Sequence, residues 1–154
     1  MNKFCFFALS LGLTLGGCSR SGPVQTPGPN LPQGVATLYA GQGFLFADAK
    51  VVNDSIGKSS DILVYVPKDT PQVFLGDSTG DIVDLGLVAL DSVKVAPDSG
   101  YTRGLLQTVK YHTYCVKAQD GKYAKLSITN VMRQYPSGSA TFLWVYQPSG
   151  AKAF

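Results

Sequence analysis

The most restrictive feature of this chain is that all ten of its acidic residues are aspartate, with no glutamate among its 154 residues. Glutamate favours helices, whereas aspartate favours turns, because its short side chain hydrogen-bonds to the nearby backbone. Between the aspartates, short runs of β-branched and aromatic residues alternate with Gly, Pro, Asn and Asp. The pattern predicts strands joined by tight turns and almost no helix.

The clearest strand pair is predicted in the last third of the chain. Runs 105–118 and 122–132 are separated by Asp120-Gly121, and Asp-Gly between two alternating runs is a strong hairpin signal. The run 141–147 is apolar on both faces, which is typical of a strand inside a sheet. Earlier runs are expected at 35–40, 43–52, 62–66, 73–75 and 82–90. Their even spacing predicts an all-β fold, an antiparallel β-sandwich or small barrel of about eight short strands.

The N-terminus has the pattern of an export leader that ends at a cysteine. Lys3 precedes an apolar run over residues 4–15, which is too short to span a bilayer. Leu15-Gly16-Gly17-Cys18 resembles the lipobox of bacterial lipoproteins, in which the leader is removed and the cysteine is acylated. The resemblance implies a signal peptide over residues 1–17, a lipidated Cys18 and attachment to a membrane by several acyl chains.

The same resemblance implies a cell-envelope location for the protein. Ser19 provides no aspartate-type signal for retention at the inner membrane, so we expect the outer membrane in a cell that has one and otherwise the outer face of the plasma membrane. Residues 18–34 are expected to be the lipidated cysteine and a tether, because four prolines and three glycines lie between Ser19 and Gly34. Residues 35–150 are expected to form a single β domain.

The net charge of the chain bears on which class of macromolecule it could bind. Without Lys3, twelve Lys and Arg stand against ten Asp, a balance that does not favour nucleic acid as a partner.

Once the leader has gone and Cys18 is acylated, Cys115 is the remaining cysteine, so no intrachain disulfide is expected. Its apolar surroundings predict a buried, unreactive thiol.

The sequence contains few residues suited to catalysis. His112 is the only histidine, and no Cys-x-x-Cys, His-Glu-x-x-His or Gly-x-Ser-x-Gly motif is present. We therefore predict no catalytic residues, no metal ligands and no enzymatic activity. The favoured function is binding of another envelope component or a small ligand, and an envelope hydrolase is an alternative.

Residues 111–131, YHTYCVKAQDGKYAKLSITNV, resemble the strand pair of the HmuY-like haem-binding lipoproteins and of related uncharacterised secreted β domains. The resemblance implies an all-β surface lipoprotein, with a haem-binding carrier as a further alternative function. That family ligates haem through two histidines, whereas this chain has His112 alone, so Tyr114 or Met132 would have to supply the second ligand. His112, Tyr114 and Met132 are therefore the candidate ligand-binding residues. We expect no cofactor, and haem is the one alternative that the resemblance suggests.

Overall fold

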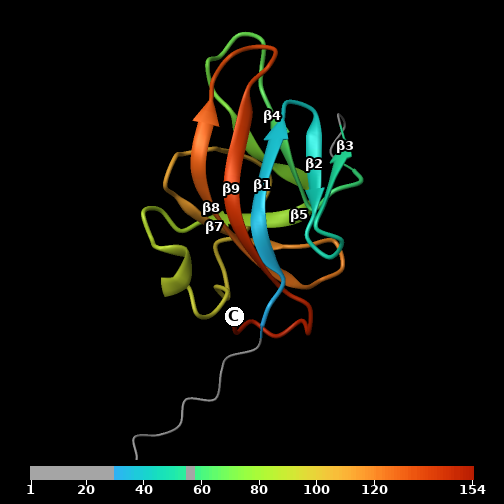
Figure 1. The fold of residues 1–154 in the computed structure, drawn as a ribbon, viewed down its shortest axis with the longest axis vertical. Helices are drawn as coiled ribbons and strands as arrows, with labels where there is room; N and C mark the ends of the chain where they lie inside the picture. Colours follow the sequence, from blue (N-terminus) through green and yellow to red (C-terminus); the bar gives the residue numbers. More distant parts are fainter. Residues whose placement is uncertain (1–29, 55–57) are drawn as a thin grey trace, which may run out of the picture.

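The computed structural model describes residues 30–54 and 58–154, so Cys18 and the leader lie outside the described part. Every pairing among the described strands is antiparallel, which confirms the predicted all-β class. No helix in these residues is long and apolar enough to cross a membrane. The elements are β1 (Gln33–Tyr39), β2 (Gln42–Leu45), β3 (Lys50–Asn53), β4 (Ile62–Tyr65), β5 (Phe74–Asp84), the short 3₁₀ turn η1 (Leu90–Ser92), β6 (Thr102–Gln107), β7 (Thr113–Lys117), β8 (Tyr123–Met132) and β9 (Ser139–Gln147) (Figure 1).

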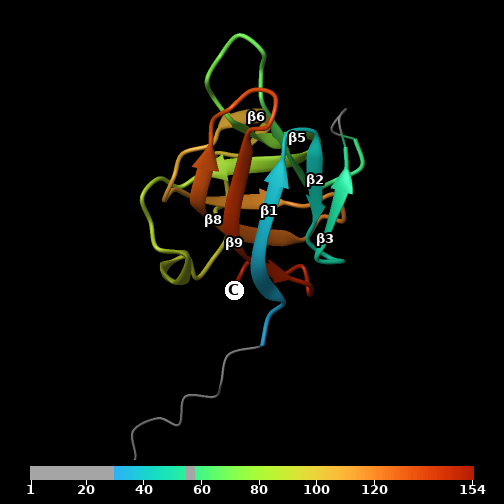
Figure 2. The same ribbon diagram turned by 45° about the horizontal axis from the view of Figure 1, so that its top comes forward.

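The strands form one curved sheet in the order β1-β9-β8-β7-β5-β4-β2-β3, and β6 pairs with β5 outside this path. Strand β5 joins the two halves of the sheet, because its first half pairs with β4 and its second half with β7. The sheet curls until β1 lies beside β2, as both ribbon views show (Figures 1 and 2). The result is a small, nearly closed barrel, in agreement with the prediction of a sandwich or small barrel.

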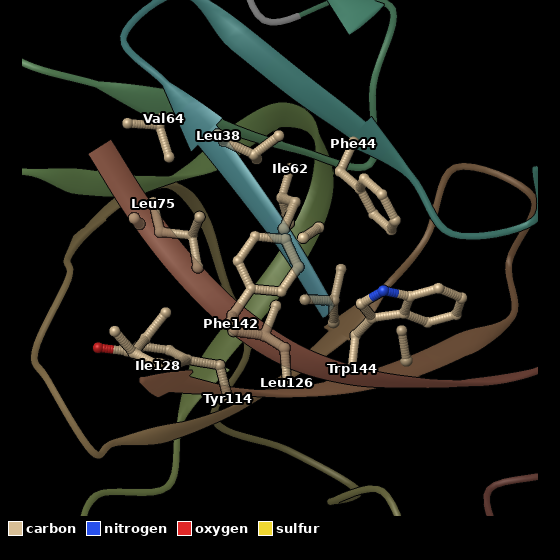
Figure 3. Close-up of a cluster of buried hydrophobic side chains, with 14 of the residues drawn as sticks. Leu38, Phe44, Ile62, Val64, Leu75, Tyr114, Leu126, Ile128, Phe142 and Trp144 are labelled. Carbon is tan, nitrogen blue, oxygen red and sulfur yellow. The ribbon is translucent and has the colours of Figure 1, made fainter. Parts of the chain in front are cut away.

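Alternating side chains from both halves of the sheet fill the barrel with one apolar core. Phe44 packs against two aromatic rings of β9 in this core, with its ring centroid 5.7 Å from that of Phe142 and 5.4 Å from that of Trp144 (Figure 3). Leu126 and Ile128 project into the same core from β8 and are fully buried. This burial of apolar surface is the main stabilising contribution in a domain whose one described cysteine forms no disulfide.

The aspartates hold turns, as the sequence composition predicts. The carboxylate of Asp54 accepts hydrogen bonds from the backbone N–H groups of Lys58 and Ser59, both at 3.0 Å, and from the Ser60 hydroxyl at 2.6 Å. Asp120 accepts one from the Lys122 N–H at 3.0 Å in the predicted β7–β8 hairpin. Short carboxylate side chains thus satisfy backbone donors that no strand partner reaches.

Two apolar runs that we predicted to be single strands contain a turn. Residues 43–52 form the β2–β3 hairpin, in which Ala49 has a φ of +50°. Residues 105–118 divide into the end of β6, a turn, and β7, and Tyr111 in that turn has a φ of +70°. Neither turn contains glycine or proline. Asp48 is the one residue of the β2–β3 turn that favours turns, and the apolar pattern continues around it, so the chain reversal is not evident in the sequence.

The opposite difference occurs at residues 76–81, which separate the predicted runs 73–75 and 82–90 in the sequence and yet lie within β5. A side chain on Gly76 would place its Cβ 2.0 Å from the carbonyl oxygen of Gly104 on β6. The glycine is therefore required by the close approach of two strands and not by a chain reversal. An irregularity in the pairing with β6, between Asp77 and Asp81, accommodates the bend of this long strand.

The outer face of β7 and β8 is covered by the segment that follows β5 and by the C-terminal residues. Cys115 is fully buried there, as predicted, and burial raises the pKa of its thiol to about 12. Lys125 is also buried, and its ammonium group donates a hydrogen bond of 2.8 Å to the carbonyl oxygen of Val93. The Phe154 N–H donates to the Lys94 carbonyl at 2.9 Å, so the chain beyond residue 150 packs against the domain.

Candidate functional site

His112 lies in the turn immediately before β7. Its Nδ1 is 2.9 and 3.0 Å from the two carboxylate oxygens of Asp84, the last residue of β5. Asp84 also accepts a 2.7 Å hydrogen bond from the Gly86 N–H. The carboxylate is therefore held by the Gly86 N–H as well as by His112. Among the residues that the structure describes, no group hydrogen-bonds to Nε2 of His112. The imidazole is thus oriented through one nitrogen, while the other can accept an external ligand.

Tyr114 lies close to His112 but has a different environment. The ring centroids of the two residues are 6.4 Å apart, and Tyr114 is fully buried, with its side chain in the core (Figure 3). Its hydroxyl donates to the Gln107 carbonyl and accepts from the Val109 N–H, both at 3.0 Å. Burial raises the pKa of Tyr114 to about 12. A neutral hydroxyl with both backbone partners in place holds the β6–β7 turn that carries His112.

Met132 is the last residue of β8 and is separated from the other two candidates. The carbonyl oxygen of His112 accepts a 3.0 Å hydrogen bond from the Ile128 N–H, so His112 lies level with Ile128. Four residues of strand at ~3.3 Å each place Met132 about 13 Å further along. The structure therefore brings together His112, Asp84 and Tyr114 and leaves Met132 apart. In the described part of the chain, no three or more His, Cys, Asp or Glu residues gather as a metal site.

A cleft that the sequence did not reveal lies on the outer face of the β7–β8 ladder, opposite the face that carries Tyr114 and the core. We call it the Tyr111 cleft; its volume is about 300 Å³. It is lined by Leu87, Val88, Ala89, Tyr111, Ser127, Ile128 and Thr129. Because neighbouring side chains at the start of β7 alternate between faces, His112 and Tyr114 point away from this cleft.

Two apolar side chains stand unusually exposed at the Tyr111 cleft. Leu87 is 77% exposed and Tyr111 is 61% exposed. A bulky residue such as Tyr111 rarely adopts a φ of +70°, and such strain typically costs ~1–3 kcal/mol. The Lys110 ammonium lies 4.9 Å from the centroid of the Tyr111 ring, a cation–π distance that helps to fix the ring outside the core.

Thr113, the first residue of β7, fixes the segment that follows β5 against the β6–β7 turn, and these two segments contribute Leu87 and Tyr111 to the cleft. Its N–H donates to the Gly86 carbonyl at 2.9 Å, and its hydroxyl donates to the Val88 carbonyl at 2.5 Å. The Tyr111 N–H donates to the Ile128 carbonyl at 2.8 Å. The cleft therefore combines preorganised apolar side chains with the hydroxyl-bearing residues Ser127 and Thr129, a composition typical of sites for small ligands with an apolar face.

Comparison with known proteins adds information about the fold. No protein-family model and no curated protein matches the chain. Among solved structures, the apo HmuY analog of Tannerella forsythia is similar over 77% of this chain and 99% of its own, with a TM-score of 0.51 and 11% identity.

Two proteins of Bacteroides also align with this chain, each with a TM-score of 0.49. One, from Bacteroides vulgatus, is provisionally described as an HmuY-like haem-binding protein and aligns over 73% of this chain and 91% of its own at 17% identity. The other, from Bacteroides fragilis, is provisionally described as a lipoprotein and aligns over 78% of this chain and 93% of its own at 11% identity. The similarity to the Tannerella forsythia structure concerns architecture alone: the β domain of this chain has the fold of that HmuY analog.

Proposed function

We propose that this chain is a lipid-anchored binding protein of the cell envelope whose non-catalytic β domain holds a small ligand in the Tyr111 cleft. The exposure of Leu87 beside a strained, outward-facing Tyr111 carries the binding part of the proposal. Single exposed apolar residues are ordinary, but paired apolar side chains around a preformed hollow of about 300 Å³ are typical of ligand sites.

The lipobox-like Leu15-Gly16-Gly17-Cys18 supports the anchoring part of the proposal. The first strand begins at Gln33, so fourteen residues separate it from Cys18. Fully extended, that length of chain spans at most about 50 Å. A domain held within that distance of a membrane surface can reach ligands or other envelope components there.

Binding at the Tyr111 cleft is tested with 2-naphthol, a neutral aromatic ring that carries one hydroxyl group. The probe is titrated into the isotope-labelled soluble chain of residues 19–154. We expect shifts of the amide signals of Val88, Tyr111 and Ser127 that saturate together. Leu87→Ser should weaken binding at least tenfold, because a buried leucine contact is worth ~1.5–3 kcal/mol and every ~1.4 kcal/mol is a factor of ten.

Tyr39→Ser is the matched control, because Tyr39 is 52% exposed at the end of β1 and does not line the cleft. This variant should bind the probe like the wild type. Shifts spread over the whole surface, or equal weakening by the two variants, would contradict the assignment of the site.

Haem carriage is a second candidate, and the His112–Asp84 pair is the observation that favours it. A carboxylate on Nδ1 makes Nε2 a better ligand for iron. The rest of the environment fits a two-ligand site poorly: the Tyr114 hydroxyl has two backbone partners, and Met132 is about 13 Å away along β8. The described residues thus offer one strong axial ligand, His112.

We therefore expect a haemin titration of the soluble chain to show weak binding, with any shift of the Soret band removed by His112→Ala. Met132→Leu should leave that shift in place, because Met132 lies about 13 Å from His112 along β8 and is not expected to touch iron. Tight one-to-one binding that is lost on changing Met132 or Tyr114 as well as His112 would make haem carriage the leading function.

A further inference from the structure

A second hollow, independent of the Tyr111 cleft, lies between the β4–β5 loop and the β8–β9 loop. Its volume is about 280 Å³. It is lined by Val66, Lys68, Asp69, Thr70, Pro71, Arg133 and Tyr135. We propose that this hollow binds an organic anion in which a phosphate or carboxylate group is attached to an aromatic or apolar body.

The charged part of the argument rests on Lys68 and Arg133, which two separate loops bring to the same hollow. Neither side chain has an ion-pair or hydrogen-bond partner within the described ranges, and Asp69 in the same wall does not pair with them. Two cations against one carboxylate leave the hollow with an excess positive charge. A guanidinium fork beside an ammonium group suits the oxygens of a phosphate or carboxylate.

The apolar part of the argument rests on the residues beside these cations. Val66 forms a buried wall, and Pro71 and the half-exposed ring of Tyr135 present flat surfaces next to the charges. An inorganic anion would leave these surfaces in contact with water, whereas an aromatic body would cover them. The site is therefore better matched to an aryl or apolar anion than to a free inorganic ion.

The β8–β9 loop that carries Arg133 and Tyr135 is held against the barrel. The Gly138 carbonyl accepts a 2.9 Å hydrogen bond from the Ala40 N–H. A Cβ on Gly138 would lie 2.7 Å from the side chain of Val66, so the loop backbone packs directly on the first residue after β4. The hollow is thus bounded by a fixed loop on this side, which reduces the entropic cost of ligand binding.

The hollow opens at the end of the barrel away from the start of the domain. Gln33 pairs with Val145 at one end of β1, and Tyr39 pairs with Ser139, next to the β8–β9 loop, at the other. The six residue steps between them correspond to about 20 Å of strand. The loops at residues 66–73 and 133–138 meet at the top of Figure 1, opposite the point where β1 begins. A tethered domain would therefore leave this site accessible.

The proposal is tested by calorimetric titration of the full chain in non-ionic detergent with four probes. Phenyl phosphate and benzoate each combine an anionic group with an aromatic ring. Inorganic phosphate has the negative charge without the ring, and benzyl alcohol has the ring without the charge. We expect saturable binding of phenyl phosphate, of benzoate or of both, and at least tenfold weaker binding of the two partial probes. Arg133→Gln and Lys68→Gln should each weaken the bound probe about tenfold.

Arg103→Gln is the matched control, because Arg103 is an exposed arginine on β6 that pairs with Asp81 at 3.4 Å. This variant should bind like the wild type, and an unchanged fluorescence spectrum of Trp144 in all variants shows that the fold is intact. Three results would overturn the proposal: no saturable binding of either complete probe, inorganic phosphate binding as tightly as phenyl phosphate, or Arg103→Gln weakening binding as much as Arg133→Gln.

Discussion

Replacing Phe142 with alanine is expected to lower the free energy of unfolding by about 3–5 kcal/mol, the usual cost of deleting a buried aromatic ring. Phe142 is fully buried on β9, and its ring meets that of Phe44 edge-on at 5.7 Å. Alanine would leave a cavity between the two halves of the curved sheet. Urea denaturation followed by fluorescence measures the loss, because Trp144 is the only tryptophan and is itself in the core.

Leu143→Ala is the control for this prediction. Leu143 is the next residue on the same strand and is 41% exposed on the outer face. Truncating it should cost less than about 1 kcal/mol, because little apolar surface is returned to water. Comparable losses in the two variants would show that the inner and outer faces of β9 have been assigned wrongly.

The β7–β8 hairpin and the core strand β9 could be predicted because local signals agree with the final fold. Asp120-Gly121 forms the turn, with Gly121 at a φ of +78°, where glycine is favoured. The side chains of Leu126 and Ile128 alternate with those of their neighbours as the period of two predicts. Consistency between turn chemistry and apolar pattern makes such segments readable without structural information.

Other strand boundaries depend on contacts between distant residues and could not be predicted. Gly76 has the appearance of a turn residue in the sequence, yet the backbone of Gly104, 28 residues further on, explains why it is glycine. The period of two in β8 places Lys125 on the face opposite Leu126, away from the core, but its burial depends on Val93 and Phe154 covering that face. A periodic pattern gives the direction of a side chain and not what will cover it.

The candidate site likewise combines residues that the sequence identifies with contacts that depend on the fold. The sequence singled out His112 because it is the only histidine, but its pairing with Asp84 depends on the β5–β7 ladder. The Tyr111 cleft was missed because Leu87 and Tyr111 stand in apolar runs, where the natural prediction is burial in a strand. Only the positive φ of Tyr111 and the hydrogen bonds of Thr113 place these side chains at the surface.

The proposal that a lipid on Cys18 holds this β domain in the cell envelope is tested most directly by labelling cells with radioactive palmitate. The wild-type chain should carry the label, and the intact mass of detergent-extracted protein should show residues 1–17 missing and an excess of several acyl chains. Cys18→Ser should lose the label completely, because its hydroxyl replaces the thiol that the resemblance implies is acylated. Cys5→Ser, which changes the cysteine inside the leader, should be labelled like the wild type. Label retained by Cys18→Ser, or a mature chain that begins at another residue, would contradict the claim.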